Sequence, residues 1–123
     1  MKAHRALIIE DDALLGTYLV ETLTGMGYEI CAIESTEAAA VSAAGRHRPD
    51  LMIVDARLRD GSGISAVRAI LGSGFVPHVF ISGDTASVQA STPTAIVLQK
   101  PFRESDLVQA VHRALAASAA GSE

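Results

Sequence analysis

Leu51-Met52-Ile53-Val54-Asp55 is a run of four apolar residues that ends in a carboxylate, and this stretch decides the fold. An apolar run without polar alternation is typical of a strand buried on both faces, as in a parallel sheet covered by helices. Four more short apolar runs follow the same pattern, at residues 6–9, 30–33, 79–81 and 95–98. The sequence therefore predicts five buried parallel strands.

Between these runs, apolar residues recur at helical spacing. They form stripes over residues 14–26, 35–44, 64–71 and 107–115. Residues 85–94 offer little apolar surface, so we expect a helix there to be short or mobile. Alternating strands and helices predict an α/β protein, a (βα)5 chain whose right-handed crossovers give a doubly wound sheet.

Composition limits the cellular setting and the kinds of partner. The 123-residue chain has a net charge of −4 and scattered basic residues, which argues against a nucleic-acid surface. Its single cysteine, Cys31, excludes an intramolecular disulfide. No apolar run approaches the roughly 18 residues of a membrane span, and no signal-peptide cleavage pattern is present. We expect a cytoplasmic domain over residues 1–118, a frayed tail over 119–123, and neither an output domain nor a membrane partner.

Polar residues gather at the expected carboxyl ends of the strands, where ligands bind in open α/β sheets. They are Glu10, Asp11 and Asp12 after the first strand, Asp55 after the third, Ser82, Gly83 and Asp84 after the fourth, and Lys100 after the fifth. An aspartate after a strand is commonly a helix N-cap, and this is our interpretation of Asp12 taken alone. The whole set at one edge of the sheet predicts a functional site.

The charges of these residues limit which ion the site can bind and which reaction it can carry out. Two carboxylates about 4 Å apart repel by roughly 4 kcal/mol at an effective dielectric constant of about 20, so Glu10, Asp11 and Asp55 together require a cation or a bound proton. A carboxylate-rich cluster suits Mg²⁺. Lys100 can pair with a carboxylate or a phosphoryl group, and Ser82 can donate a hydrogen bond to a phosphoryl oxygen. These residues favour phosphoryl transfer through an acyl phosphate.

With these residues in these positions, the sequence resembles the receiver domains of bacterial response regulators, including the chemotaxis-regulator type. The resemblance spans essentially the whole chain and rests on Glu10-Asp11, Asp55, Asp60-Gly61, Ser82-Gly83 and Lys100-Pro101-Phe102. It implies a flavodoxin-like five-stranded parallel sheet of strand order 2-1-3-4-5. Residues 77–83 and 97–102 are further similar to stand-alone single-domain receivers, whose fourth strand typically reads Pro-Phe-x-Phe-Ala-Thr-Gly-Tyr.

The resemblance also implies a role for each site residue. The expected assignments are Asp55 as phosphoacceptor; Glu10, Asp11, Asp55 and the Arg57 backbone carbonyl as Mg²⁺ ligands; and Ser82, the Gly83 N–H and Lys100 as phosphoryl contacts. Such a domain is a switch and not an enzyme, since its only chemistry is to gain a phosphoryl group and slowly lose it.

Several positions depart from the family pattern. Val97 stands where an aromatic residue usually swings inward on activation, so the usual aromatic switch is absent or uses another reporter. Leu58-Arg59 replaces a common hydrophobic-Pro pair, and we expect a looser loop there. We expect Arg57 and Asp84 either to pair across the mouth of the site or to remain separately solvated. Segment 85–94 is the expected mobile signalling element.

The sequence is compatible with three functions. The leading one is a single-domain response regulator that takes a phosphoryl group from a histidine kinase or histidine phosphotransfer protein. It would signal to an unknown downstream protein by contact or by onward phosphotransfer. An unphosphorylated receiver-like interaction module comes second. A phosphatase comes last, because aspartate-based hydrolases typically carry a second aspartate two residues after the nucleophile, where this chain has Arg57. The sequence leaves homodimerisation open.

Overall fold

The computed structural model describes residues 4–121, and its strands form one parallel sheet. The strands are β1 (His4–Ile9), β2 (Tyr28–Glu34), β3 (Leu51–Asp55), β4 (His78–Ser82) and β5 (Val97–Gln99). They lie in the order β2-β1-β3-β4-β5, and every neighbouring pair is parallel. The predicted sheet and its strand order are confirmed.

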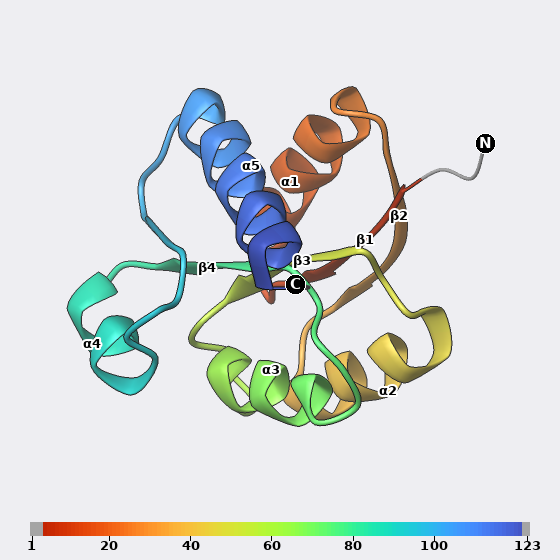
Figure 1. The fold of residues 1–123 in the computed structure, drawn as a ribbon, viewed down its shortest axis with the longest axis vertical. Helices are drawn as coiled ribbons and strands as arrows, with labels where there is room; N and C mark the ends of the chain where they lie inside the picture. The colour runs from red at the N-terminus through yellow and green to blue at the C-terminus, as the bar shows by residue number, and fades with distance from the viewer. Residues whose placement is uncertain (1–3, 122–123) are drawn as a thin grey trace.

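Five helices connect and cover the strands. They are α1 (Ala13–Gly25), α2 (Glu37–His47), α3 (Gly63–Leu71), α4 (Thr85–Ser91) and α5 (Glu104–Gly121). Figure 1 shows α1 and α5 on one face of the sheet, α2 and α3 on the other, and α4 at the edge near β5. This is the flavodoxin-like arrangement that the alternating pattern predicts.

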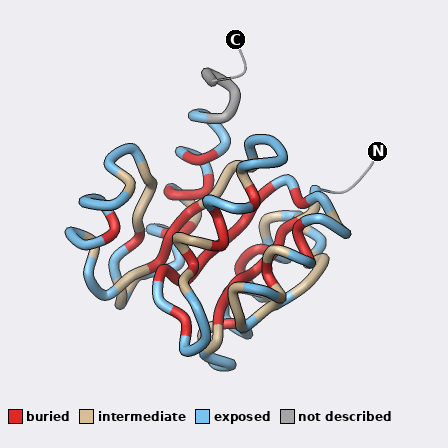
Figure 2. The backbone as a smooth tube through the Cα atoms, turned by 90° about the horizontal axis from the view of Figure 1, so that it is seen from below, coloured by how far each residue is buried: buried red, intermediate tan, exposed pale blue. Residues whose placement is uncertain are grey.

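The alternating side chains of the strands create two cores. In β3, Met52 and Val54 pack with residues of α2 and α3, whereas Leu51 and Ile53 pack with residues of α1 and α5. The whole of β3 is buried, including its last residue, Asp55. In Figure 2 the buried residues run through the middle of the molecule, and the exposed ones lie on the outer turns.

Each of the first four helices begins at a side chain that accepts a backbone N–H. Asp12 accepts from Leu14 and Leu15 at the start of α1, which confirms its interpretation as an N-cap. Ser62 does the same for Ser65 in α3. The equivalent residues for α2 and α4 are Thr36 and Asp84. These bonds satisfy N–H groups that have no partner inside the helix.

One expectation about the helices needs correction, and another stays untested. Leu14 belongs to the predicted apolar stripe of α1, but it is 82% exposed, so the buried stripe starts further along the helix. Helix α5 ends at Gly121, so residues 119–121 of the expected frayed tail lie within the helix and residues 122–123 lie outside the described residues. The fraying of this tail stays a prediction. No helix within residues 4–121 has both the length and the apolar character that crossing a membrane requires.

Helix α4 is short, as its sequence predicts. It has seven residues, and its buried residue is Val88. A helix with so little buried apolar surface gains little from packing, because most helical stability in proteins comes from the apolar face. Its mobility stays a prediction.

Candidate functional site

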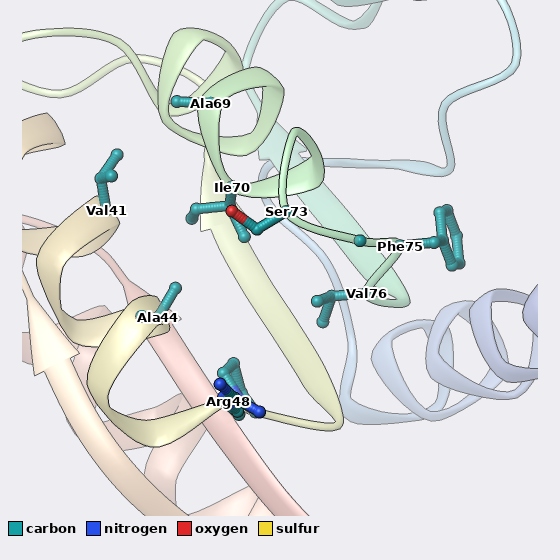
Figure 3. Close-up of a pocket in the computed structure, with 11 residues that line it drawn as sticks. Val41, Ala44, Arg48, Ala69, Ile70, Ser73, Phe75 and Val76 are labelled. Atoms are coloured by element: carbon teal, nitrogen blue, oxygen red, sulfur yellow. The ribbon is translucent and has the colours of Figure 1, made fainter.

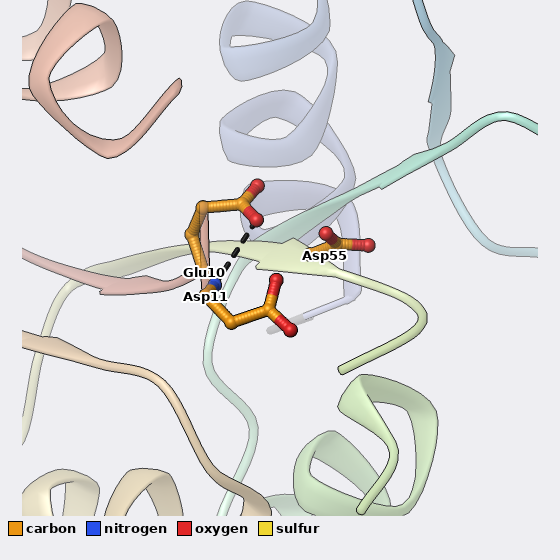
Figure 4. A group of neighbouring side chains, drawn as sticks. All are labelled: Glu10, Asp11 and Asp55. Atoms are coloured by element: carbon orange, nitrogen blue, oxygen red, sulfur yellow. Dashed lines mark hydrogen bonds between the residues drawn. The ribbon is translucent and has the colours of Figure 1, made fainter. Parts of the chain in front are cut away.

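Three carboxylates meet at the carboxyl edge of the sheet. Glu10 and Asp11 follow β1, and Asp55 ends the neighbouring strand β3. One oxygen atom from each residue lies within 4.8 Å of the other two. Figure 4 shows the side chains of Glu10 and Asp11 projecting from the turn after β1 on the side where Asp55 lies. Strand pairing thus assembles the predicted acidic cluster.

Glu10 is the most deeply buried member of this cluster. Its Oε2 accepts the N–H groups of Asp11 and Asp12, each at 3.1 Å, whereas its Oε1 is buried without a hydrogen-bond partner among the described residues. Burial, followed by the proximity of Asp55, raises the pKa of Glu10 from 4.5 to about 8. Without a cation, the cluster therefore relieves its charge repulsion by holding a proton on Glu10 near neutral pH.

Asp55 is paired directly with Lys100. The Lys100 Nζ lies 3.0 Å from Asp55 Oδ2, and the Arg57 N–H donates to Asp55 Oδ1 at 3.1 Å. Partial burial lowers the pKa of Lys100, but the contact with Asp55 and the other nearby acids raise it by more, so the net direction is upward. Lys100 is therefore charged at neutral pH. Its side chain is 34% exposed, whereas that of Asp55 is 7% exposed.

A polar cleft of about 500 Å³ opens beside this ion pair. Asp55, Lys100, Ser82 and Gly83 all line it. The Ser82 Oγ accepts the N–H of Asp84 at 2.9 Å, which leaves its hydroxyl hydrogen free to donate elsewhere. Gly83 is exposed, and a Cβ there would meet no atom within 4 Å. The cleft can therefore admit a small anionic group next to Asp55.

The pairing of Arg57 with Asp84, one of two expected alternatives, is not formed. Both residues line the cleft, but no ion pair within 4.0 Å joins them among the described residues. The Asp84 carboxylate instead accepts the N–H of Ser87 at the start of α4.

Several contacts hold the loop after β3. Leu58 is 5% exposed and packs in the core. The Arg59 N–H donates to Asp11 Oδ2 at 2.7 Å, and the Ser62 N–H donates to Glu37 Oε1 at 2.8 Å. Whether the loop is looser than in proteins with the common hydrophobic-Pro pair stays a prediction. The sequence analysis missed these two hydrogen bonds because their donors are backbone amides. The position of Glu37, just after the N-cap Thr36, was the one sign that its carboxylate could accept a nearby N–H.

A second hollow, of about 480 Å³, lies away from the acidic cluster. It runs between the last turns of α2 and α3 and the segment before β4 (Figure 3). Among the described residues, Arg48 is the one charged residue that lines it, and no carboxylate does. It offers none of the chemistry found beside Asp55.

The acidic cluster fits Mg²⁺. Mg²⁺ prefers oxygen ligands and is commonly held by one or two carboxylates together with water and phosphate oxygens. The three carboxylates supply such oxygens, and the unpartnered Glu10 Oε1 is a buried acceptor in need of a positive partner. The structure thus brings together Glu10, Asp11 and Asp55 as the residue types and their spacing predict.

A doubly wound sheet with an acidic cluster, a paired lysine and a hydroxyl at its carboxyl edge defines a receiver domain. The family model of the response regulator receiver domain matches residues 6–112, and the chain belongs to this family. It is 34% identical over 116 residues to the transcriptional regulatory protein PdtaR of Mycobacterium tuberculosis, which covers 91% of this chain and 57% of that protein.

Other relatives agree with this assignment. The chain is 31% identical over 117 residues to the phyllosphere-induced regulator PhyR of Methylorubrum extorquens, covering 92% of this chain and 44% of that protein. It thus spans about half the length of these curated relatives. Among solved structures, a response regulator receiver protein from Sinorhizobium medicae superposes with a TM-score of 0.84 at 30% identity, covering 94% of this chain and 97% of that one.

Proposed function

We propose that this chain is the receiver domain of a response regulator and accepts a phosphoryl group on Asp55 in a Mg²⁺-dependent reaction. The observation that carries this proposal is the 3.0 Å ion pair between Lys100 and Asp55, set beside the carboxylates of Glu10 and Asp11. A carboxylate nucleophile, a movable cation and further acids around an open cleft are the groups that phosphoryl transfer to a carboxylate needs.

The metal would be held by Glu10, Asp11 and Asp55 together with the backbone carbonyl of Arg57. When bound, Mg²⁺ offsets the negative charge that accumulates where carboxylates and phosphoryl oxygens meet. Glu10 would bind the metal as a carboxylate, so a bound cation would lower its pKa, which burial raises in the metal-free protein.

The transfer itself is a displacement at phosphorus. One carboxylate oxygen of Asp55 forms a bond to phosphorus while the bond between phosphorus and the donor's imidazole nitrogen breaks, and that electron pair leaves with the imidazole. Lys100 then moves its contact from the Asp55 carboxylate to a phosphoryl oxygen, which its flexible side chain allows. The Ser82 hydroxyl and the Gly83 N–H, both in the cleft, donate to the other oxygens.

The partners follow from this chemistry. A phosphorylated histidine supplies the phosphoryl group, so the donor is a histidine kinase or a histidine phosphotransfer protein in the cytoplasm. A downstream protein then reads the phosphorylated state by contact or takes the phosphoryl group in turn. The protein acts as a switch and not as an enzyme with a separate substrate.

Intact mass spectrometry tests the proposal directly. The protein is incubated with a small phosphodonor and Mg²⁺, beside Asp55→Asn, a chelated sample and the control Asp60→Asn, which changes an exposed aspartate of the same loop. We expect one added phosphoryl group in the wild-type protein and in Asp60→Asn, and none in the other two samples. A folded wild-type protein that gains no phosphoryl group and binds no Mg²⁺ would instead be an unphosphorylated interaction module.

A further inference from the structure

Glu37 lies outside the acidic cluster but joins the start of α2 to the loop after β3. Its Oε1 accepts the Ser62 N–H at 2.8 Å, and its own N–H donates to the Asp60 carbonyl at 3.1 Å. Thr36, the residue before it, forms a parallel bridge with Asp60. One residue of α2 therefore holds this loop through both its backbone and its side chain.

Ser62 links this contact to the acidic cluster. Arg57 and Ser62 form an antiparallel bridge across the loop, so their backbones lie side by side. The next residue, Gly63, donates its N–H to the Ala56 carbonyl at 3.1 Å. A Cβ on Gly63 would overlap the backbone carbonyl oxygen of Asp55, so the start of α3 lies directly against the strand that carries the phosphoacceptor.

Gly61 shows that the loop is shaped around Glu37. Its φ is +93°, which glycine adopts without strain. A Cβ at Gly61 would overlap the Cβ of Glu37 and lie 2.8 Å from Glu37 Oε1. The close approach that lets the Glu37 carboxylate reach the Ser62 N–H therefore depends on a residue without a side chain.

We propose that Glu37 is a positioning residue for the metal site. Its carboxylate makes a charge-assisted bond to the Ser62 N–H, and the paired backbone of Arg57 is held through Ser62. The Arg57 carbonyl is the one backbone ligand of the proposed Mg²⁺ site, so fixing it raises the affinity for the metal. This inference rests on the proposed Mg²⁺-dependent function.

The test measures the Mg²⁺ dissociation constant by isothermal titration calorimetry. Glu37→Ala removes the acceptor for the Ser62 N–H and should weaken Mg²⁺ binding by about tenfold, the lower end of what losing an outer partner of a metal ligand costs. Glu37→Gln keeps an amide oxygen at the same place. It should restore most of the affinity, because a neutral acceptor still holds the N–H, though less strongly.

Thr36→Val is the matched control. It removes the Thr36 Oγ that accepts the Ala39 N–H at 3.1 Å, so it weakens the same helix start while leaving Glu37 in place. Its Mg²⁺ affinity should equal that of the wild-type protein. An equal loss in Thr36→Val would show that any damage to α2 weakens the site, and would overturn a specific role for Glu37.

Failure of this inference is distinguishable from failure of the proposed function. Wild-type protein that binds Mg²⁺ and becomes phosphorylated, beside a folded Glu37→Ala variant with unchanged affinity, overturns only the role of Glu37. Wild-type protein that binds no Mg²⁺ overturns both. Circular dichroism at the titration temperature establishes that each variant is folded.

Discussion

Glu10 is the residue whose protonation should control the stability of the metal-free protein. Its pKa is raised to about 8 in the folded protein, against 4.5 for the ordinary group. An acid with a higher pKa in the folded state favours folding while it is protonated. Its contribution is therefore complete below about pH 4.5 and is lost as the pH rises toward about 8.

We predict that, without divalent cations, the melting temperature falls as the pH rises through this range. Glu10→Gln, which stays neutral and keeps an acceptor oxygen, should show a flatter dependence. Thermal unfolding followed by circular dichroism at a series of pH values measures both. Identical slopes in the two proteins would contradict this account of Glu10.

At the scale of elements, the contact between α3 and β3 leaves no room for a side chain. A Cβ on Gly63 would overlap the Asp55 carbonyl oxygen, a backbone atom that cannot move without displacing β3. We predict that Gly63→Ala destabilises the protein by about 3 kcal/mol or more, in the range of severe overpacking. Urea denaturation measures the loss.

Gly45→Ala is the matched control for this prediction. Gly45 lies inside α2, and a Cβ there would meet no atom within 4 Å. Alanine in a helix interior is favoured over glycine, so this variant should gain about 0.5–1 kcal/mol. If Gly63→Ala and Gly45→Ala change the free energy of unfolding by the same amount, the close contact of α3 with β3 does not contribute to stability.

Helix α4 is the element most suited to respond to phosphorylation. It contributes one buried residue, Val88, and its N-cap Asp84 lines the cleft beside Asp55 together with Ser82, the last residue of β4. We predict that beryllium fluoride with Mg²⁺, a phosphoryl mimic, slows amide hydrogen exchange in residues 85–91, because a bound anion fixes Ser82, whose Oγ accepts the N–H of the α4 N-cap Asp84. Equal exchange with and without the mimic would remove α4 as the signalling element.

The sequence predicts a strand or helix well where an unbroken run of apolar residues determines its burial. The unbroken apolar run of β3 required a strand buried on both faces, and that strand was found. Leu14 lies in the predicted apolar stripe but is exposed, because helical spacing identifies a stripe and not where the neighbouring elements end. The predicted run at 95–98 became β5 at Val97–Gln99, since its register is set by pairing with β4.

In the candidate site, too, some residues could be predicted from the sequence and some contacts could not. Side chains with distinctive chemistry, such as Asp55 and Lys100, could be predicted because each follows an apolar run. The contacts of Arg59 and Ser62 with Asp11 and Glu37 could not, since every residue except proline carries a backbone N–H and the sequence does not say which ones point at a carboxylate.

At the scale of the whole molecule, the proposed metal ligands come from separate parts of the chain and meet only in the folded protein. Mg²⁺ should therefore bind the folded state in preference to the unfolded one. We predict that the melting temperature at neutral pH rises with the logarithm of the Mg²⁺ concentration once that concentration exceeds the dissociation constant. Differential scanning calorimetry measures this rise, with NaCl of equal ionic strength as the control; an equal rise in NaCl would show charge screening alone.

Lys100 follows directly after β5, a three-residue strand at the edge of the sheet. Short edge segments detach at a small fraction of the free energy that global unfolding requires. Detachment of β5 carries Lys100 away from Asp55 but leaves the carboxylates of β1 and β3 together. Loss of the Lys100–Asp55 contact would therefore leave the two cores and the acidic cluster in place, so a measurement that reports only on the core would not detect it.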